Sequence, residues 1–438
     1  MTTNAKKTKF LASLVIFSLV GQIAWVVENM YFNVFIYKMF HATPADISAM
    51  VMASAVAATV TTLIMGALSD KLGRRKVFMA GGYILWGISI LSFAFIREDV
   101  VGLLFPAAAS VSAICVTLVI VMDCVMTFFG STANDACFNA WLTDSTQHTS
   151  RGSAEGINAM MPLIAILAVF GGFMNFDLGK SESWTLIFTI IGIAVTVIGI
   201  LGFFIIDEPH RKADGTDRYF ANIVYGFRPS VVRQNPLLYL LLIAFALFGI
   251  SIQIFMPYLI LYYTEGLHME GYVLVMAPAI ILASVFTVIW GRVHDKVGFR
   301  LSILPALGLL CLGYILLFFF RSTALVFVGS LTMMCGYLAG TAVFGAAIRD
   351  YTPEGRAGMF QGLRIAGQVL IPGVIGPAIG AWVLRNAETV IGDDGTESFI
   401  PNQNIFLAAL VAALVLGLFL ALLLYVMKKK TAKETAHE

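Results

Sequence analysis

The chain has 438 residues, of which 59% are hydrophobic and only 12% are charged, and its formal net charge is +2. Its mean hydropathy is +0.87. Because soluble globular proteins carry roughly 25% charged residues, this composition excludes an ordinary soluble domain and indicates a polytopic membrane protein. The small net charge gives no indication of a nucleic-acid partner.

Twelve windows are apolar and long enough to cross a bilayer, which takes about 20 residues. They are 10–37, 46–69, 77–96, 114–142, 156–175, 184–206, 237–263, 271–292, 301–320, 323–348, 359–384 and 403–427. The apolar segment 101–113 is left over, and we expect an outer loop or a lengthened helix end there. The pattern predicts an all-α membrane protein with two pseudo-symmetric six-helix bundles. We place them at 1–206 and 237–438, the latter with a cytoplasmic tail, joined by a cytoplasmic loop at 207–236.

Lys and Arg residues indicate the orientation of these spans. If the N-terminus is inside, the outer loops carry only a few basic residues, namely Lys38, Arg97, Lys180, Arg321 and Arg385. Nearly all the others lie in the inner loops and the tails, as the positive-inside rule requires. We therefore expect a multi-pass plasma-membrane protein with both termini in the cytoplasm. The first apolar run, to Ile36, is too long for a signal peptide and is expected to be an uncleaved span.

A short motif occurs twice, at equivalent places in the two halves. GALSDKLGRR (66–75) follows the second span, and GRVHDKVGFR (291–300) follows the eighth. The positions that match at one constant offset are Gly66, Asp70, Lys71, Gly73 and Arg75 with Gly291, Asp295, Lys296, Gly298 and Arg300. Short inner loops are often basic and contain glycine, but a five-residue match at one offset indicates an internal repeat.

The sequence GALSDKLGRRK resembles the signature loop of the major facilitator superfamily, Gly-x-x-x-Asp-x-x-Gly-Arg-[Arg/Lys]-[Arg/Lys]. The loops DSTQHTSRGSAEGI and RDYTPEGRAGMFQGLR are similar to the Asp…Arg loops of that superfamily. The resemblance implies two bundles around a central cavity that opens alternately to the two sides of the membrane. It also implies a conformational latch formed by Gly66, Asp70, Gly73, Arg74 and Arg75. In the second copy, Asp295 and Arg300 correspond, and Phe299 replaces the first arginine.

Four ionisable residues lie within the predicted spans: Glu28, Asp123, Asp135 and Arg364. Each costs at least about 2.5 kcal/mol at the bilayer centre, so such residues usually face a cavity or a partner. At 1.5 Å per residue, Asp135 and Arg364 both lie ~10 Å from the inner ends of their helices. This predicts a charge pair, and the alternative is that Arg364 extends to the inner surface. Asp123 is a second candidate for ion coupling.

Polar side chains on the first helix form the main candidate substrate surface. Gln22, Trp25, Asn29 and Asn33 fall on one arc, with Glu28 at its edge. A flat aromatic ring beside amides and a carboxylate suits the ring face and the hydroxyls of a sugar. The alternative is a polar clasp between helices. The other candidates are Asn134, which shares one side of the fourth helix with Asp123, Thr127 and Gly130, and Gln253 and Gln368. Tyr258, Tyr262 and Tyr263 are expected to be interface anchors.

Acidic residues on the fourth helix and Arg364 on the eleventh resemble the glycoside–pentoside–hexuronide cation symporters within the superfamily. Those symporters place acidic cation ligands on the second helix, and here that helix carries no carboxylate between Asp46 and Asp70. A proton is therefore the expected coupling ion, with another monovalent cation as the alternative.

These observations predict a secondary active transporter that imports a sugar or glycoside by proton- or cation-coupled symport. The scattered histidines support no metal site, and we expect no cofactor, no enzymatic activity and a monomer in the lipid bilayer. The alternatives are an exporter of amphipathic organic compounds and a non-transporting membrane sensor. The polar arcs on helices one, four and eleven favour transport, because a sensor needs no ion-coupling carboxylate.

Overall fold

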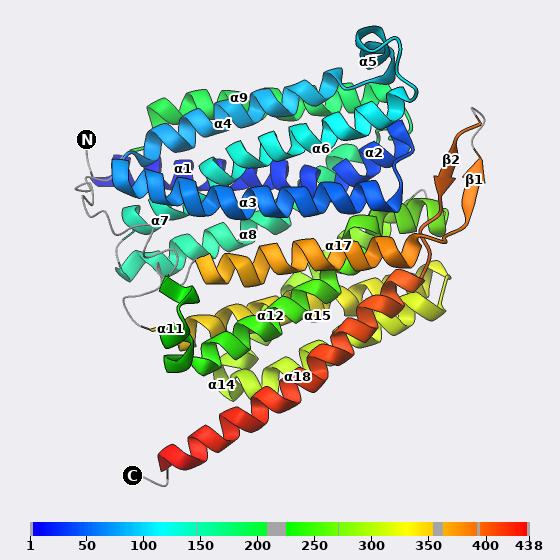
Figure 1. Ribbon diagram of the computed structural model, residues 1–438. Helices are drawn as coiled ribbons and strands as arrows, with labels where there is room; N and C mark the ends of the chain where they lie inside the picture. Colours follow the sequence, from blue (N-terminus) through cyan, green and yellow to red (C-terminus); the bar gives the residue numbers. More distant parts are fainter. Residues whose placement is uncertain are drawn as a thin grey trace. The chain divides into compact units, whose positions relative to one another are not determined.

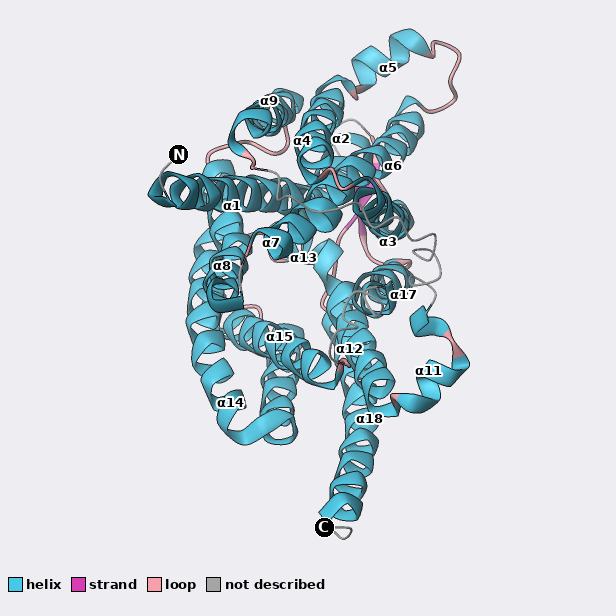
Figure 2. Cartoon of the chain, turned by 90° about the vertical axis from the view of Figure 1, so that its left-hand side faces the viewer, coloured by secondary structure: helices cyan, strands magenta, loops and turns pink. Residues whose placement is uncertain are grey.

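The computed structural model describes residues 3–146, 148–207, 225–269, 271–353, 362–391 and 395–435. This part of the chain is almost entirely helical, with one two-stranded hairpin (Figure 2). Eleven of its helices are long and apolar enough to cross a membrane. One of them, α14 (Tyr272–Phe319), is interrupted at Gly298, where φ is 73° and ψ is 176°, and so comprises two helices. All twelve predicted spans are therefore confirmed.

The chain divides into two compact units (Figure 1). Unit 1 comprises Met1–Tyr219 and Val390–Ser398, and unit 2 comprises Phe220–Thr389 and Phe399–Glu438. The hairpin is formed by β1 (Thr389–Ile391) and β2 (Glu397–Phe399), so its inner residues group with unit 1. The predicted bundle boundary at 207–236 stays a prediction, since 208–224 lie outside the described residues.

The helices of unit 1 are α1 (Thr3–Val26), α2 (Phe32–Phe40), α3 (Pro44–Leu72), α4 (Arg75–Ser92), α5 (Glu98–Leu104), α6 (Val111–Gly130), α7 (Asn139–Ser145), α8 (His148–Phe173) and α9 (Ser181–Ile205). A π-helical segment, Val27–Tyr31, joins α1 to α2, and a second one, Ser131–Phe138, joins α6 to α7. Each of these two series of segments is one continuous membrane span. A short 3₁₀ turn, Phe93–Phe95, follows α4.

The helices of unit 2 are α11 (Pro229–Gln234), α12 (Pro236–Phe255), α13 (Leu259–Leu261), α14, α15 (Thr323–Tyr351), α17 (Ile371–Leu384) and α18 (Asn404–Thr435). Tyr225–Phe227 and Met256–Tyr258 are 3₁₀ turns, and Tyr262–Gly266 and Ala366–Leu370 are π-helical segments.

Local sequence fixes the ends of the second span. Thr43 and Asp46 form a capping box at the start of α3: the Asp46 N–H donates to Thr43 Oγ1 (3.2 Å), and the Thr43 N–H donates to Asp46 Oδ2 (2.8 Å). At the other end Gly73 has a φ of 62°, which favours glycine and terminates the helix. Gly298, its counterpart in the repeat, also has a positive φ, with a ψ of 176°. Both matched positions therefore have backbone conformations that favour glycine.

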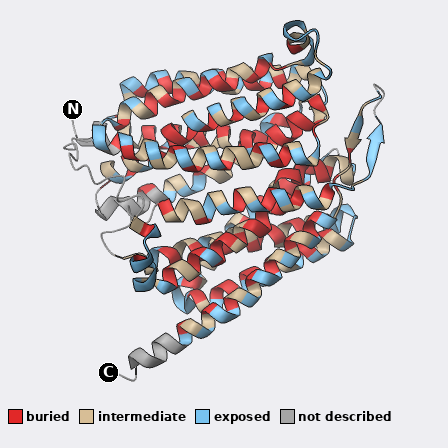
Figure 3. Ribbon diagram, viewed as in Figure 1, coloured by how far each residue is buried: buried red, intermediate tan, exposed pale blue. Residues whose placement is uncertain are grey.

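Apolar residues on α18 divide between two faces, as the alternating colours along this helix show (Figure 3). The buried face carries Phe406, Ala409, Ala413, Leu416 and Leu420. The exposed face carries Leu407, Val411, Leu414, Leu418 and Leu422. A long stripe of exposed aliphatic side chains on a spanning helix is the surface expected to face lipid.

Two expectations concern the ends of the spans. The left-over segment 101–113 is a connection followed by a lengthened helix end: α5 covers its start, where Leu103 is 83% exposed, and α6, which belongs to the fourth span, begins at Val111. The expectation that Tyr258, Tyr262 and Tyr263 are interface anchors is wrong, because all three are buried. The Tyr263 hydroxyl lies 2.6 Å from Ser330 Oγ, and so a partner within the bundle satisfies it.

Glycines allow close helix contact within unit 2. A Cβ on Gly336 of α15 would collide with the backbone of Leu310 on α14, whereas a Cβ on Gly345 of the same helix would meet no atom within 4 Å. Small residues at helix contacts are the usual basis of tight packing in membranes.

We predict that Gly336→Ala lowers the melting temperature of the protein in detergent, because overpacking costs about 1–3 kcal/mol. The matched control Gly345→Ala should leave the melting temperature unchanged or raise it slightly, since alanine favours helix by about 1 kcal/mol over glycine. Equal melting temperatures for the two variants would contradict the packing described here.

Candidate functional site

Two carboxylates and two hydroxyls meet inside unit 1, where the first, second and fourth spans come together. Ser54 Oγ on α3 donates to Glu28 Oε1 (2.8 Å), and Thr127 Oγ1 on α6 donates to the same oxygen (2.9 Å). The two hydroxyl oxygens are 2.9 Å apart. Asp123 lies one turn from Thr127 on the same helix, close enough to Glu28 for the two carboxyl groups to interact electrostatically. These four residues are called the carboxylate cluster below.

The carboxylate cluster is nearly dry. Glu28 is 6% exposed and Asp123 is 1% exposed. Glu28 Oε2 and Asp123 Oδ1 are both buried without a hydrogen-bond partner in the described structure. Among the described residues, no Lys or Arg forms an ion pair with either acid. Two buried negative charges without a cation would be very costly, so at least one of the acids must be protonated or paired with a cation.

Most of the predicted polar residues lie on or beside π-helical segments. Glu28 and Asn29 lie in Val27–Tyr31, Asn134 and Asp135 in Ser131–Phe138, and Gln368 in Ala366–Leu370. A π-helical turn inserts an extra residue into the helix and is often found at functional sites.

Trp25 and Asn134 lie together in unit 1 and form part of a hydrogen-bond chain. Trp25 Nε1 donates to Asn134 Oδ1 (3.3 Å), Asn134 Nδ2 donates to the Tyr83 hydroxyl (2.7 Å), and Tyr83 donates to the Phe17 carbonyl (2.6 Å). Trp25 also packs on Trp86, with ring centroids 5.0 Å apart. For Asn134, which is buried, this is the arrangement expected of a polar clasp between helices.

The remaining polar residues of the first span differ in exposure. Asn29 is exposed and Gln22 is half-buried, whereas Asn33 is buried with its Oδ1 unpartnered. The Asn29 side chain donates to the Trp25 carbonyl (2.8 Å), and that of Asn33 donates to the Asn29 carbonyl (3.1 Å). The predicted substrate residues of this span that have exposed surface, and that a solute could therefore contact, are Gln22, Trp25 and Asn29.

The two members of the predicted charge pair lie in different units, and each is described in its own. Asp135 in unit 1 accepts a hydrogen bond from Ser131 Oγ (2.9 Å). In unit 2, Arg364 is half-buried and its Nε donates to Gln368 Oε1 at 3.4 Å. The Asp135–Arg364 pair stays a prediction.

Gln253, on α12, is half-buried and packs against Gly376 of α17.

The predicted latch contains one buried ion pair within unit 1. Arg75 is 4% exposed, its Nε lies 3.3 Å from Asp144 Oδ2, and its Nη1 donates to Ser69 Oγ. Asp144 lies on α7, at the end of the fourth span. Arg74 is exposed, Gly66 lies at the end of the second span where it accepts from Ser69 Oγ (3.0 Å), and the Asp70 side chain lies outside the described residues.

The second copy of the latch is more open. Asp295 is exposed and Arg300 is half-buried, and Phe299, in the place of Arg74, is buried.

Across the described residues, no group of three His, Cys, Asp or Glu side chains is placed to hold a metal ion.

The carboxylate cluster includes one residue that the sequence did not indicate. Glu28, Asp123 and Thr127 are unusual in position or charge, but Ser54 is one of several hydroxyl residues on the second span. Only the packing of α3 against α6 distinguishes Ser54 from the other hydroxyl residues of the second span.

We predict that Asp123→Asn raises the melting temperature of the protein in detergent near neutral pH, because it removes a buried, poorly solvated carboxyl group. Each kcal/mol gained corresponds to roughly 2–4 °C in a domain of 150–250 residues. The exposed carboxylate of Glu182 on α9 provides the control, Glu182→Gln, which should have no effect. A lower melting temperature for Asp123→Asn alone would mean that this carboxyl group stabilises the fold.

Comparison with known proteins agrees with this architecture. No curated protein matches the chain in sequence. A solved structure of a bacterial homologue of the human lysosomal transporter Spinster has a TM-score of 0.69 and 16% identity, covering 97% of this chain and 98% of the other. The nucleoside transporter NupG has a TM-score of 0.70 and 12% identity, covering 94% and 98%. The xylose transporter XylE from E. coli has a TM-score of 0.65 and 15% identity, covering 93% and 96%.

At these identities the likeness to solved structures shows the fold. The family is shown separately, because the model of the Major Facilitator Superfamily matches residues 10–343. With its twelve spans, its repeated loop motif and this match, the chain belongs to the Major Facilitator Superfamily of membrane transporters.

Proposed function

We propose that the protein is a proton-coupled secondary transporter that imports a small polar organic solute, a sugar or glycoside, across the plasma membrane by alternating access. Both termini would be cytoplasmic. The observation that carries this proposal is the carboxylate cluster: a buried Glu28 that accepts hydrogen bonds from two hydroxyls, and a buried Asp123 nearby, with no ion pair to either acid among the described residues. Such an arrangement is costly for stability, and intramembrane carboxylates of this kind mark ion pathways.

Proton counting supports Asp123 as the group that carries the coupling proton. Each hydroxyl has a single proton to donate, and those of Ser54 and Thr127 are both directed at Glu28 Oε1. Neither hydroxyl then has a proton left to donate to an ionised Asp123. A proton on Asp123 removes that need. It leaves one negative charge in the cluster, on Glu28, which accepts two hydrogen bonds at Oε1.

This proposal moves Glu28 from the substrate surface to the coupling machinery. It also explains how the first, second and fourth spans could couple proton binding to conformation. If a conformational change separates Ser54 from the two acids or admits water, the cost of ionising Asp123 falls and the proton leaves. The two conformations then bind the proton with different affinity, and by linkage the proton and the solute bias the same equilibrium.

The partly exposed surface of Trp25, Asn29 and Gln22 supports a sugar-like solute. An aromatic face and amide groups match a carbohydrate ring and its hydroxyls, and the names of two structurally similar proteins, a nucleoside transporter and a xylose transporter, are in line with this class. An exporter of amphipathic compounds is the alternative outcome of a solute screen.

Transport by purified protein in proteoliposomes tests the coupling proposal. An inwardly directed proton gradient should drive accumulation of a solute from a sugar and nucleoside panel. Asp123→Asn should abolish accumulation but retain exchange of labelled solute, because the amide mimics the protonated acid without releasing a proton. Thr127→Val, which removes one of the two hydrogen bonds to Glu28, should shift the pH dependence of uptake.

The control for this experiment is again Glu182→Gln, which should accumulate solute like the wild type. Accumulation by Asp123→Asn at the wild-type level would contradict the coupling role. Accumulation driven by a sodium gradient and not by a proton gradient would mean that sodium, and not a proton, is the coupling ion at this site.

A second experiment tests the proposed pair of Asp135 and Arg364. We expect Arg364→Ala to be severely impaired, because it leaves a buried carboxylate without its partner. The double variant Arg364→Ala with Asp135→Asn should be less impaired than the two single effects predict. Initial rates of solute exchange measure these effects, and strict additivity would show that the two side chains do not interact.

A further inference from the structure

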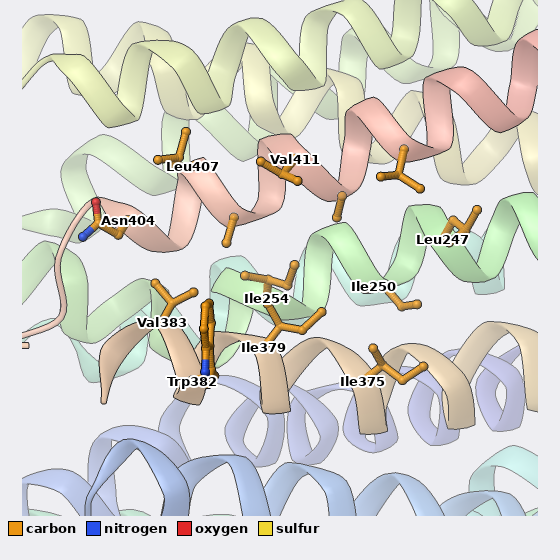
Figure 4. A pocket seen from close by; sticks show the side chains of 13 residues that line it. Leu247, Ile250, Ile254, Ile375, Ile379, Trp382, Val383, Asn404, Leu407 and Val411 are labelled. Atoms are coloured by element: carbon orange, nitrogen blue, oxygen red, sulfur yellow. The ribbon is translucent and has the colours of Figure 1, made fainter. Parts of the chain in front are cut away.

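An apolar groove runs along the surface of unit 2 between α12, α17 and α18 (Figure 4). Its volume is about 590 Å³. Aliphatic side chains from all three helices line it, including Ile250, Ile254, Ile375, Ile379, Leu407 and Val411. All three helices are membrane spans, so the groove opens to the hydrocarbon of the bilayer.

The length of the groove corresponds to one leaflet. Its lining on α18 extends from Asn404 to Val415, a distance of roughly 16 Å at 1.5 Å per residue. The hydrocarbon core of a bilayer is about 30 Å thick, so each leaflet contributes roughly 15 Å. A straight acyl chain of one leaflet therefore fits the groove from end to end.

The two ends of the groove differ in polarity. Leu247 and Ile375 lie at one end of the groove, opposite Asn404 and Trp382 (Figure 4). At the other end, Asn404 and the indole of Trp382 are beside the connection between α17 and α18. The guanidinium of Arg385, which is exposed, lies 5.0 Å from the Trp382 ring centroid. Within the described residues, Arg385 forms no ion pair, although Glu388 follows three residues later.

We propose that this groove is a binding site for one glycerophospholipid. One acyl chain lies along the groove, and the phosphate contacts Arg385, with Asn404 and the Trp382 indole at the level of the headgroup. The cation at the polar end favours an anionic phosphate over an uncharged lipid or an apolar helix of another protein. Because other lipids offer the same hydrocarbon, selectivity must come from close packing and the phosphate contact and not from a hydrophobic driving force.

Native mass spectrometry of the detergent-solubilised protein, titrated with phosphatidylglycerol, tests this site. The wild type should retain one phosphatidylglycerol molecule. Diacylglycerol, which has the same chains and no phosphate, should bind at least about tenfold more weakly, a difference of about 1.4 kcal/mol. Arg385→Gln should weaken phosphatidylglycerol binding by a similar factor and leave diacylglycerol binding unchanged.

Two variants that fill the groove, Val411→Trp and Ala408→Phe, should each lose the bound lipid while keeping the wild-type elution volume. The matched control is Leu418→Trp on the same helix, at a position that is 76% exposed and outside the groove, which should retain it. The proposal is overturned if both groove-filling variants keep the lipid. It is equally overturned if diacylglycerol and phosphatidylglycerol bind alike, or if the groove instead joins two copies of the chain.

Discussion

The burial of two carboxyl groups, Glu28 with its two hydroxyl donors and Asp123 close by, is the constraint on which the proposed mechanism depends. Three spans must pack closely enough for Ser54 and Thr127 to reach one oxygen of Glu28 at 2.8 and 2.9 Å, and the same packing keeps water away from both acids. Each intramembrane carboxylate costs at least about 2.5 kcal/mol. A protein that needed only stability would have apolar residues there, so the cluster indicates selection for a function.

The π-helical segments are part of the same arrangement. In a regular α-helix, the side chains after Val27 and Ser131 would point in other directions around the helix axis. The extra residue of a π-helical turn therefore changes which side chains face the neighbouring spans. Glu28 and the pair Asn134 and Asp135 lie in these segments. The same two spans also carry the hydrogen bond between Trp25 and Asn134, so the proposed solute-contacting and proton-binding residues lie on the same pair of spans.

The sequence was sufficient to predict the twelve spans, because long apolar runs and basic inner loops report the membrane directly. It also predicted the repeat, whose glycines at 73 and 298 both have a positive φ. It could not predict the π-helical segments, which depend on neighbouring helices, or the hydrogen bond of Ser54, which is one of several hydroxyl residues on the second span. Tyr258, Tyr262 and Tyr263 were misplaced because outer-end position alone does not show whether a partner such as Ser330 is available inside the bundle.

The number of protons moved per solute tests the central claim most directly, since the proposal assigns the coupling proton to Asp123 alone. Reversal potentials of a purified transporter in proteoliposomes, measured with an uncharged solute at several pH gradients, give this ratio. We expect one proton per solute molecule in the wild type. A ratio of two would require both acids to be protonated and released, and a ratio of zero would mean that the carboxylate cluster does not couple transport to protons.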